Sequence, residues 1–242
     1  MLDDRYICAA RNNAELCDAV CRAHGSPGEF HEDLWLCRHP VPRFYPNAVT
    51  LAPNHKLLDP IEELLAMRLP SGWAVKDSFA TLDLAPRGFH LLFTAEWIYF
   101  PVSRMKQIAA AGRSVRWEVV HSERMLAEWE SAWAASSSDT SNERVFLPPL
   151  LDDEDIAVIA GYSDDRIVAG AIANRSDGVV GWSNFFAPPN DVFSFAAESL
   201  TEIGKAFPDL PIVGYEHGAE LRNAQTLGFE SLGPLRVWMS QS

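Results

Sequence analysis

Three consecutive side chains near the end of the chain, Tyr215, Glu216 and His217, include the residue types of an acid–base site. The first two close the apolar run "LPIVGYE", and His217 follows it. Such a run is typical of a buried strand, and the carboxyl ends of such strands commonly face the ligand in open sheets. A carboxylate there can accept a proton from an amine, and an imidazole, with a pKa near neutral, can share that task. The alternative is structural: Glu216 pairs with Arg222 or Arg236, and His217 is a loop residue.

The composition limits the classes of partner. The 242-residue chain has 20 Lys and Arg against 33 Asp and Glu, and its formal net charge of -13 disfavours binding to a phosphate backbone or an anionic membrane. No apolar run approaches the roughly 20 residues of a membrane helix, and the start "MLDDRYICAARNN" lacks the basic and apolar segments of a secretory signal. We therefore expect a cytoplasmic protein that binds a small-molecule substrate and neither nucleic acid nor membrane, with a homodimer left open.

The cysteines lie together near the start of the chain. They are Cys8, Cys17, Cys21 and Cys37. Their spacing matches no zinc pattern such as paired C-x2-C. Free cysteine is among the most often buried residues, so buried thiols without disulfides are expected. The alternative is a metal site that also uses the nearby His24, His31 and His39.

Hydrophobic periodicity and turn residues divide the chain into two halves that both mix helices and strands. In the first half the pattern predicts a helix over 13–24, a strand over 48–51, a helix that begins at 59–60, and a hairpin of strands 72–84 and 89–101. In the second it predicts a strand over 115–122, a helix capped by Ser122, a three-strand meander within 152–188, a helix over 191–207, a strand over 210–216, a short helix and a last strand. The expected class is α+β with a mixed sheet, and the expected domains are 1–110 and 113–242.

A Gly228-Phe229 pair just after the last helix completes a known pattern. This order of elements, with a tail of the form GYE…GF…LRVW, resembles the GCN5-related N-acetyltransferase (GNAT) family over about residues 115–242. The first hundred residues, including "FYPNAVTL" at 44–51, resemble a partial copy of the same fold, as in tandem members. The resemblance implies a GNAT-like fold in the C-terminal half and a smaller, partial GNAT-like domain before it.

The resemblance also implies an acyltransferase that uses acetyl-CoA or another acyl-CoA and an amine or other small nucleophile. In that family acyl-CoA lies where two parallel strands splay apart, here the strand that ends at 182–187 and the strand 212–216. The pantetheine arm pairs with the first strand, and the pyrophosphate sits at the N-terminus of the next helix, where free N–H groups and the helix dipole favour an anion. The implied cofactor-binding residues are Phe185, Phe186, Ala187, Asp191, Val192, Phe193 and Ser194, and the catalytic candidates are Glu216 and His217.

Several residues depart from the family pattern. "PPNDVFS" at 188–194 has no glycine for a phosphate loop, Pro188 and Pro189 lack N–H donors, and Asp191 puts a negative charge where the diphosphate would lie. We expect Asp191 to cap its own helix instead. Ala224 stands where the family often has a tyrosine acid, and it cannot protonate a leaving thiolate. A second hypothesis therefore stays open: a non-catalytic binding or assembly module that has kept the fold and lost the pyrophosphate loop.

Overall fold

The structure, a computed structural model, describes residues 3–53, 58–66, 72–108, 115–136, 141 and 143–241. The elements before residue 110 are α1 (Asp4–Ala23), β1 (Glu29–Phe30), β2 (Leu34–Leu36), β3 (Ala48–Thr50), α2 (Leu58–Ala66), β4 (Ala74–Asp77), η2 (Ala85–Arg87), β5 (Phe89–Phe100) and α3 (Val102–Ile108). Those after it are β6 (Arg116–Val119), α4 (Glu123–Ser136), η3 (Pro148–Asp152), β7 (Ile156–Ser163), β8 (Arg166–Ser176), β9 (Val179–Phe186), α5 (Val192–Ala206), β10 (Ile212–Glu216), α6 (Gly218–Leu227) and β11 (Glu230–Ser240).

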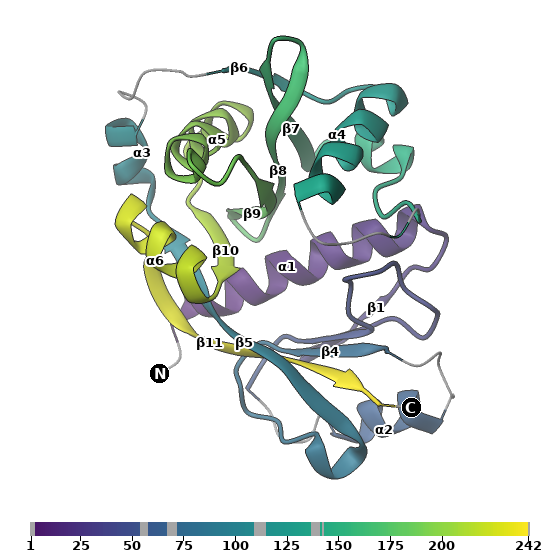
Figure 1. Cartoon of the computed structure of the whole chain (residues 1–242). Helices are drawn as coiled ribbons and strands as arrows, with labels where there is room; N and C mark the ends of the chain where they lie inside the picture. Colours follow the sequence, from purple (N-terminus) through teal and green to yellow (C-terminus); the bar gives the residue numbers. More distant parts are fainter. Residues whose placement is uncertain are drawn as a thin grey trace.

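The described strands form one mixed sheet in the order β1-β2-β3-β4-β11-β5-β10-β9-β8-β7-β6 (Figure 1). Two neighbouring pairs, β3–β4 and β9–β10, are parallel, and the others are antiparallel. The predicted α+β class with a mixed, largely antiparallel sheet is therefore confirmed, as is the predicted meander, now β7, β8 and β9.

The same order of elements occurs in both halves. A three-strand meander, a helix and a strand parallel to the third strand make up β1–β2–β3–α2–β4, and again β7–β8–β9–α5–β10. The strand that follows each unit then pairs with the other unit: β5 lies beside β10, and β11 lies beside β4. This exchange joins both halves into one sheet, and the division at 110–113 stays a prediction.

The predicted hairpin of strands 72–84 and 89–101 is wrong, because β11 lies between β4 and β5. β4 ends early, at Asp77, where the buried carboxylate accepts hydrogen bonds from the backbone N–H groups of Thr81 (3.1 Å) and Leu82 (2.9 Å) and so holds a turn. Because β11 is antiparallel to both neighbours, β4 and β5 run in the same direction. The turn signal at Pro86–Gly88 belongs to a crossover connection.

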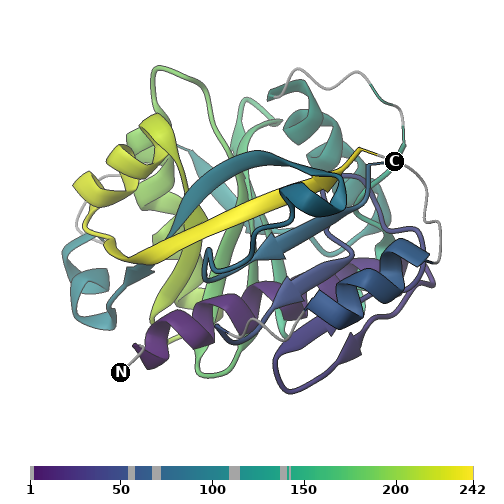
Figure 2. The same ribbon diagram turned by 90° about the horizontal axis from the view of Figure 1, so that it is seen from below.

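Helices cover both faces of the sheet. α1 crosses strands of both halves (Figures 1 and 2). It shares its face of the sheet with α4, through a core that includes Leu16, Val20, Leu126 and Trp129. The opposite face carries α5, α6 and α3. The predicted first helix, 13–24, begins nine residues earlier, at Asp4, because Asp3 caps it by accepting a hydrogen bond from the Arg5 N–H at 3.0 Å.

Two local predictions at helix ends are confirmed. Ser122 caps α4, with its hydroxyl accepting from the Met125 N–H at 3.3 Å. α6 ends at Gly228, whose φ of 112° is left-handed, and Phe229 is buried behind it.

The thiols of Cys17, Cys21 and Cys37 are buried and that of Cys8 is half-buried. Within the described part of the chain, no helix has the length and apolarity to cross a membrane.

Candidate functional site

The parallel strands β9 and β10 form a wedge. They pair only at Val180 with Ile212 and at Gly181 with Val213. Beyond that point β9 continues to Phe186 against β8, and β10 continues to Glu216 against β5. Among the described strands none fills the gap between them. The splayed strands expected from the sequence are thus present.

Two local features shape the wedge. At its apex a Cβ on Gly214 would lie 2.8 Å from the carbonyl oxygen of Trp182, so only glycine permits this approach. Further along, β9 bulges: its register with β8 shifts between Gly170 and Ile172, and Asn184 has a left-handed φ of 51°. A bulge of this kind bends its strand, and it lies in the part of β9 that no longer pairs with β10.

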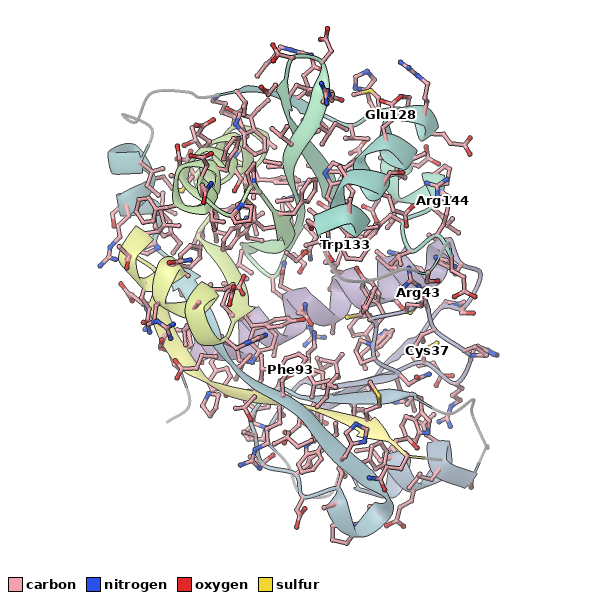
Figure 3. All side chains as sticks on the ribbon, viewed as in Figure 1. Cys37, Arg43, Phe93, Glu128, Trp133 and Arg144 are labelled. Atoms are coloured by element: carbon pink, nitrogen blue, oxygen red, sulfur yellow. The ribbon has the colours of Figure 1, made fainter. Side chains whose placement is uncertain are left out.

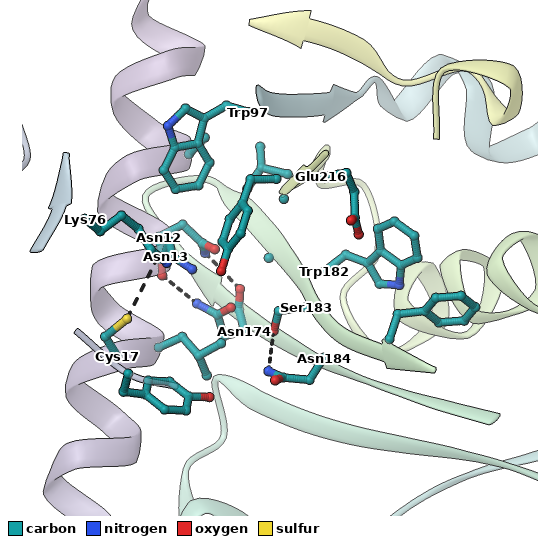
Figure 4. A pocket seen from close by; sticks show the side chains of 18 of the residues that line it. Asn12, Asn13, Cys17, Lys76, Trp97, Asn174, Trp182, Ser183, Asn184 and Glu216 are labelled. Atoms are coloured by element: carbon teal, nitrogen blue, oxygen red, sulfur yellow. Dashed lines mark hydrogen bonds between the residues drawn. The ribbon is translucent and has the colours of Figure 1, made fainter. Parts of the chain in front are cut away.

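A cavity of about 250 Å³ lies at the wedge and extends to α1 (Figure 4). Both halves of the chain line it. The first half contributes, among others, Asn12, Asn13, Cys17, Tyr45, Lys76 and Trp97, and the second contributes Asn174, the segment 181–185 and the segment 213–216.

Glu216 is half-buried at the end of β10 and lines this cavity. Burial raises the pKa of its carboxyl to about 7, and the nearby carboxylate of Glu220 adds to the rise. Neither Arg222 nor Arg236 forms an ion pair with Glu216 among the described residues; Arg222 donates instead to the Gly218 carbonyl at 3.0 Å. Neither arginine therefore supports the alternative in which Glu216 forms a structural ion pair. The raised pKa of the Glu216 carboxyl suits a general base.

His217 lies apart from Glu216. It is exposed at the N-terminal end of α6 and is not among the residues that line the cavity. Its ring lies 5.4 Å, between centroids, from that of Phe93. Phe93 belongs to β5 and is labelled in Figure 3. The side chains of Glu216 and His217 thus lie in different surroundings, and of the two only Glu216 lines the cavity.

The predicted cofactor residues fall into two groups. Phe185 lines the cavity and packs on Trp182, Phe186 is buried against Trp129, and Ala187 is half-buried. The second group begins α5, where Val192 is half-buried and the others are exposed: Asp191, Phe193 and Ser194.

The predicted cap on α5 is wrong. Asp191 is the N-cap residue, but its side chain accepts no capping hydrogen bond, and its φ of -124° and ψ of 10° differ from the extended backbone typical of a side-chain cap. The backbone makes the turn itself, with the Asp191 N–H donating to the Pro188 carbonyl at 3.0 Å. The N-terminus of α5 is therefore not closed by its own carboxylate.

Ala224 is buried in the core between the sheet and α5 and α6, with 2% of its surface exposed. A phenol would not fit there without displacing neighbours such as Phe229. The core around position 224 therefore has room for alanine but not for the tyrosine that the resemblance implies there.

Sequence reasoning missed the polar residues that the first half brings to the cavity. The side-chain amides of Asn12 and Asn174 each donate to the other residue's carbonyl at 2.9 Å, and the Lys76 ammonium donates to Asn13 Oδ1 at 2.6 Å. Their neighbours in sequence include other polar residues, such as Arg11, Asp77 and Arg175, so the sequence offered no signal that sets them apart. No group of three or more His, Cys, Asp or Glu suited to a metal occurs among the described residues.

Comparisons with known proteins address the fold. No protein-family model matches the chain, and no curated protein matches its sequence. Among solved structures, a GCN5-related N-acetyltransferase from Kribbella flavida aligns with a TM-score of 0.66 and 15% identity, over 97% of this chain and 96% of that one. A functionally unknown conserved protein from Staphylococcus epidermidis aligns with a TM-score of 0.62 and 12% identity, over 86% and 84%.

A third structure extends the same result. A GCN5-related N-acetyltransferase-like protein from Streptococcus suis aligns with a TM-score of 0.51 and 14% identity, over 96% of this chain and 98% of that one. The alignments with the Kribbella flavida and Streptococcus suis structures cover 96% or more of this chain, so they include its first half. The chain therefore has the fold of the GCN5-related N-acetyltransferases along nearly its whole length.

Proposed function

We propose that this chain is an acyltransferase that moves an acyl group from an acyl-CoA to an amine or another small nucleophile. The observation that carries the proposal is the wedge: β9 and β10 part beyond Gly181 and Val213, and the cavity there is lined by Glu216, whose carboxyl pKa is raised to about 7. A fold alone hosts many functions, so the weight rests on this site.

The residues present fit the pantetheine arm of an acyl-CoA. Beyond Gly181, β9 has no strand partner on the side of β10 among the described residues, so its backbone groups are available to the amides of the arm. The pyrophosphate would lie at the start of α5, near Val192–Ser194, where Asp191 does not occupy the N–H groups as a cap. Pro188 and Pro189 bring no donors there, so fewer hydrogen bonds would hold the phosphates.

The cavity residues define the chemistry of transfer. The amine attacks the thioester carbonyl carbon, the Glu216 carboxylate accepts a proton from the amine, and the carbon–sulfur bond breaks to release the CoA thiolate. Backbone N–H groups near Phe185–Ala187 would stabilise the oxyanion. The thiolate takes its proton from water or from Glu216, because Ala224 has none to give. We assign the base to Glu216 rather than His217, since His217 is exposed and outside the cavity.

The second candidate is a non-catalytic binding or assembly module. The prolines before α5 and the buried Ala224 favour it, because they remove phosphate donors and a family acid. Under this alternative the cavity would bind a small ligand without turnover.

Thermal unfolding with acetyl-CoA and longer acyl-CoAs separates the two. A ligand at 100 times its Kd stabilises the folded state by about 2.7 kcal/mol, so millimolar acyl-CoA should raise Tm by several degrees if the affinity is micromolar. ATP, which shares the adenosine and phosphates but has no pantetheine arm, is the matched control and should raise Tm less. Equal Tm values with and without every acyl-CoA would remove the acyltransferase proposal.

A further inference from the structure

Phe44 lies where the cavity opens. It belongs to the loop between β2 and β3, and it lines the cavity together with Tyr45 and Pro46. Among the described residues that line the cavity, Phe44 alone is exposed, with an exposed fraction of 66%. The other lining residues are buried or half-buried. Phe44 therefore marks the mouth, where an apolar ring meets an entering ligand.

The backbone at Phe44 has a conformation that disfavours a large side chain. The Tyr45 N–H donates to the Pro42 carbonyl at 3.2 Å, which closes a turn over 42–45 with Phe44 as its third residue. The φ of Phe44 is 69°, and a positive φ at this place in a turn favours glycine or asparagine, because a Cβ is crowded there. Bulky residues in this region are outliers that gather at ligand sites. The strain at Phe44 thus points to a role for its ring.

Two neighbours hold the ring of Phe44 in place. The Arg43 guanidinium lies over the ring, 5.0 Å from its centre, and donates to the Glu143 carbonyl at 3.0 Å. The Trp133 ring of α4 meets the Phe44 ring edge-on, at 5.7 Å between centroids. Arg43 and Trp133 are labelled in Figure 3. These contacts orient the ring, and they still leave most of it exposed.

More aromatic side chains line the cavity behind Phe44. Tyr45 follows it in the loop, and Trp97 of β5 and Tyr215 of β10 meet edge-on at 5.5 Å between centroids. Aromatic rings attract other rings in offset-stacked or edge-on arrangements, beyond the gain from burying apolar area. A held, exposed ring at the mouth and aromatic side chains within therefore suit a ligand that carries a planar ring.

We propose that the acceptor is a small aromatic amine, whose ring packs on Phe44 at the mouth of the cavity. This inference rests on the proposed acyl transfer for the role of the amine. The volume of about 250 Å³ is below the roughly 300–1,000 Å³ of sites for drug-sized ligands, which favours a small acceptor. The net charge of -13 attracts a protonated amine. The structure places the ring, and the test varies the number of carbons between ring and amine.

Matched ligand pairs test this directly. Binding is measured by titration calorimetry, without acyl-CoA, for the phenylalkylamines from benzylamine to 4-phenylbutylamine and for the alkylamines of the same chain length without a ring. We expect at least one phenylalkylamine to bind the wild-type protein about tenfold or more tightly than its alkylamine, and more tightly than its cyclohexyl analogue, which is apolar but not planar. Equal affinities within every pair, an equally tight cyclohexyl analogue, or no binding of any phenylalkylamine at millimolar concentration would each overturn the proposal.

Three variants assign the preference to a residue. In Phe44→Gly the ratio of the two affinities should fall by about fivefold or more, because a ring–ring contact is lost. Phe44→Tyr keeps the ring and should keep the ratio. Phe30→Ala removes an exposed ring of β1 that does not line the cavity, and this control should also keep it. A ratio that survives Phe44→Gly overturns the role of Phe44.

Urea unfolding and the oligomeric state test the two other roles for the ring, as packing for Trp133 or as a contact with a second copy of the chain. Phe44→Gly should unfold at a higher urea concentration than Phe44→Ala, because glycine adopts a φ of 69° without strain. The reverse order, or a wild-type dimer that dissociates in Phe44→Gly, would overturn the proposal. Because no acyl-CoA is present, a failure here is distinct from a failure of acyl-CoA binding, which the thermal experiment measures separately.

Discussion

Glu220, in the first turn of α6, raises the pKa of Glu216 at the end of β10, in addition to the larger effect of burial. Burial disfavours the charged carboxylate, and a second carboxylate nearby disfavours it further. The outcome is a pKa of about 7 in place of 4.5. A carboxyl with this pKa is a stronger base than an ordinary glutamate and is still half ionised near neutral pH.

The first prediction concerns the pH dependence of activity. Glu216 must be ionised to accept a proton, so kcat/KM should rise with pH and reach half its plateau near the pKa of about 7. In Glu220→Gln one cause of the raised pKa is gone, and the midpoint should move to lower pH while staying above 4.5, because burial persists. Asp165→Asn, at an exposed carboxylate, should leave the midpoint in place. An identical midpoint in Glu220→Gln would show that the profile reports another group.

The second prediction concerns stability and does not depend on turnover. Because the folded-state pKa of Glu216 is raised from 4.5 to about 7, the folded state holds a proton that the unfolded state releases. The wild-type protein should lose stability as pH rises from 4.5 through about 7. Glu216→Gln lacks this loss, so urea unfolding should show it to be more stable than wild type above pH 7, with the gap closing near 4.5. A gap that does not change with pH would contradict the raised pKa.

The third prediction follows from the missing cap on α5. The Asp191 side chain makes no capping hydrogen bond, so Asp191→Ala should change the free energy of unfolding by less than about 0.5 kcal/mol. Asp3→Ala, which removes the cap that α1 does have, should cost about 0.5–2 kcal/mol. In calorimetry, Asp191→Ala should also bind acetyl-CoA more tightly, because a negative charge near the pyrophosphate is gone. Loss of stability equal to that of Asp3→Ala would restore the capping interpretation.

These cases show which parts of the molecule the sequence could predict. Local patterns predicted the meander, the Ser122 cap and the end of α6 at Gly228, because each depends on neighbours in sequence. The place of β11 between β4 and β5 depends on which distant strands pair, and turn residues carry no such information. The predicted cap at Asp191 is wrong for a geometric reason. Aspartate is a common capping residue, but the backbone angles of Asp191 are not those of a side-chain cap.

The candidate site divides in the same way. The position of Glu216 could be predicted because it ends a buried strand, and the strand alone sets that position. The position of Lys76 beside the cavity could not, because its contacts with Asn13 of α1 and Tyr215 of β10 form only in the assembled sheet.

The fourth prediction tests the apex of the wedge. A Cβ at position 214 would press on the backbone oxygen of Trp182, which cannot move without shifting β9. Gly214→Ala should therefore lower the free energy of unfolding by about 1–3 kcal/mol and weaken acetyl-CoA binding. In Gly204→Ala, on α5, the added Cβ meets only the flexible end of Met105, and the gain in helix propensity of up to about 1 kcal/mol works against that contact. Equal effects of the two changes would mean that the close approach at the apex does not matter.

The most direct test of the account is the rate of CoA thiol release from acetyl-CoA, measured with a panel of amino acids and amines for wild type and Glu216→Gln. A positioned general base contributes about 10²–10⁴-fold, so kcat should fall by that factor in Glu216→Gln while the Kd for acetyl-CoA stays the same. His217→Ala, which removes an exposed side chain outside the cavity, should retain most of the rate. Equal rates for wild type and Glu216→Gln would contradict the account.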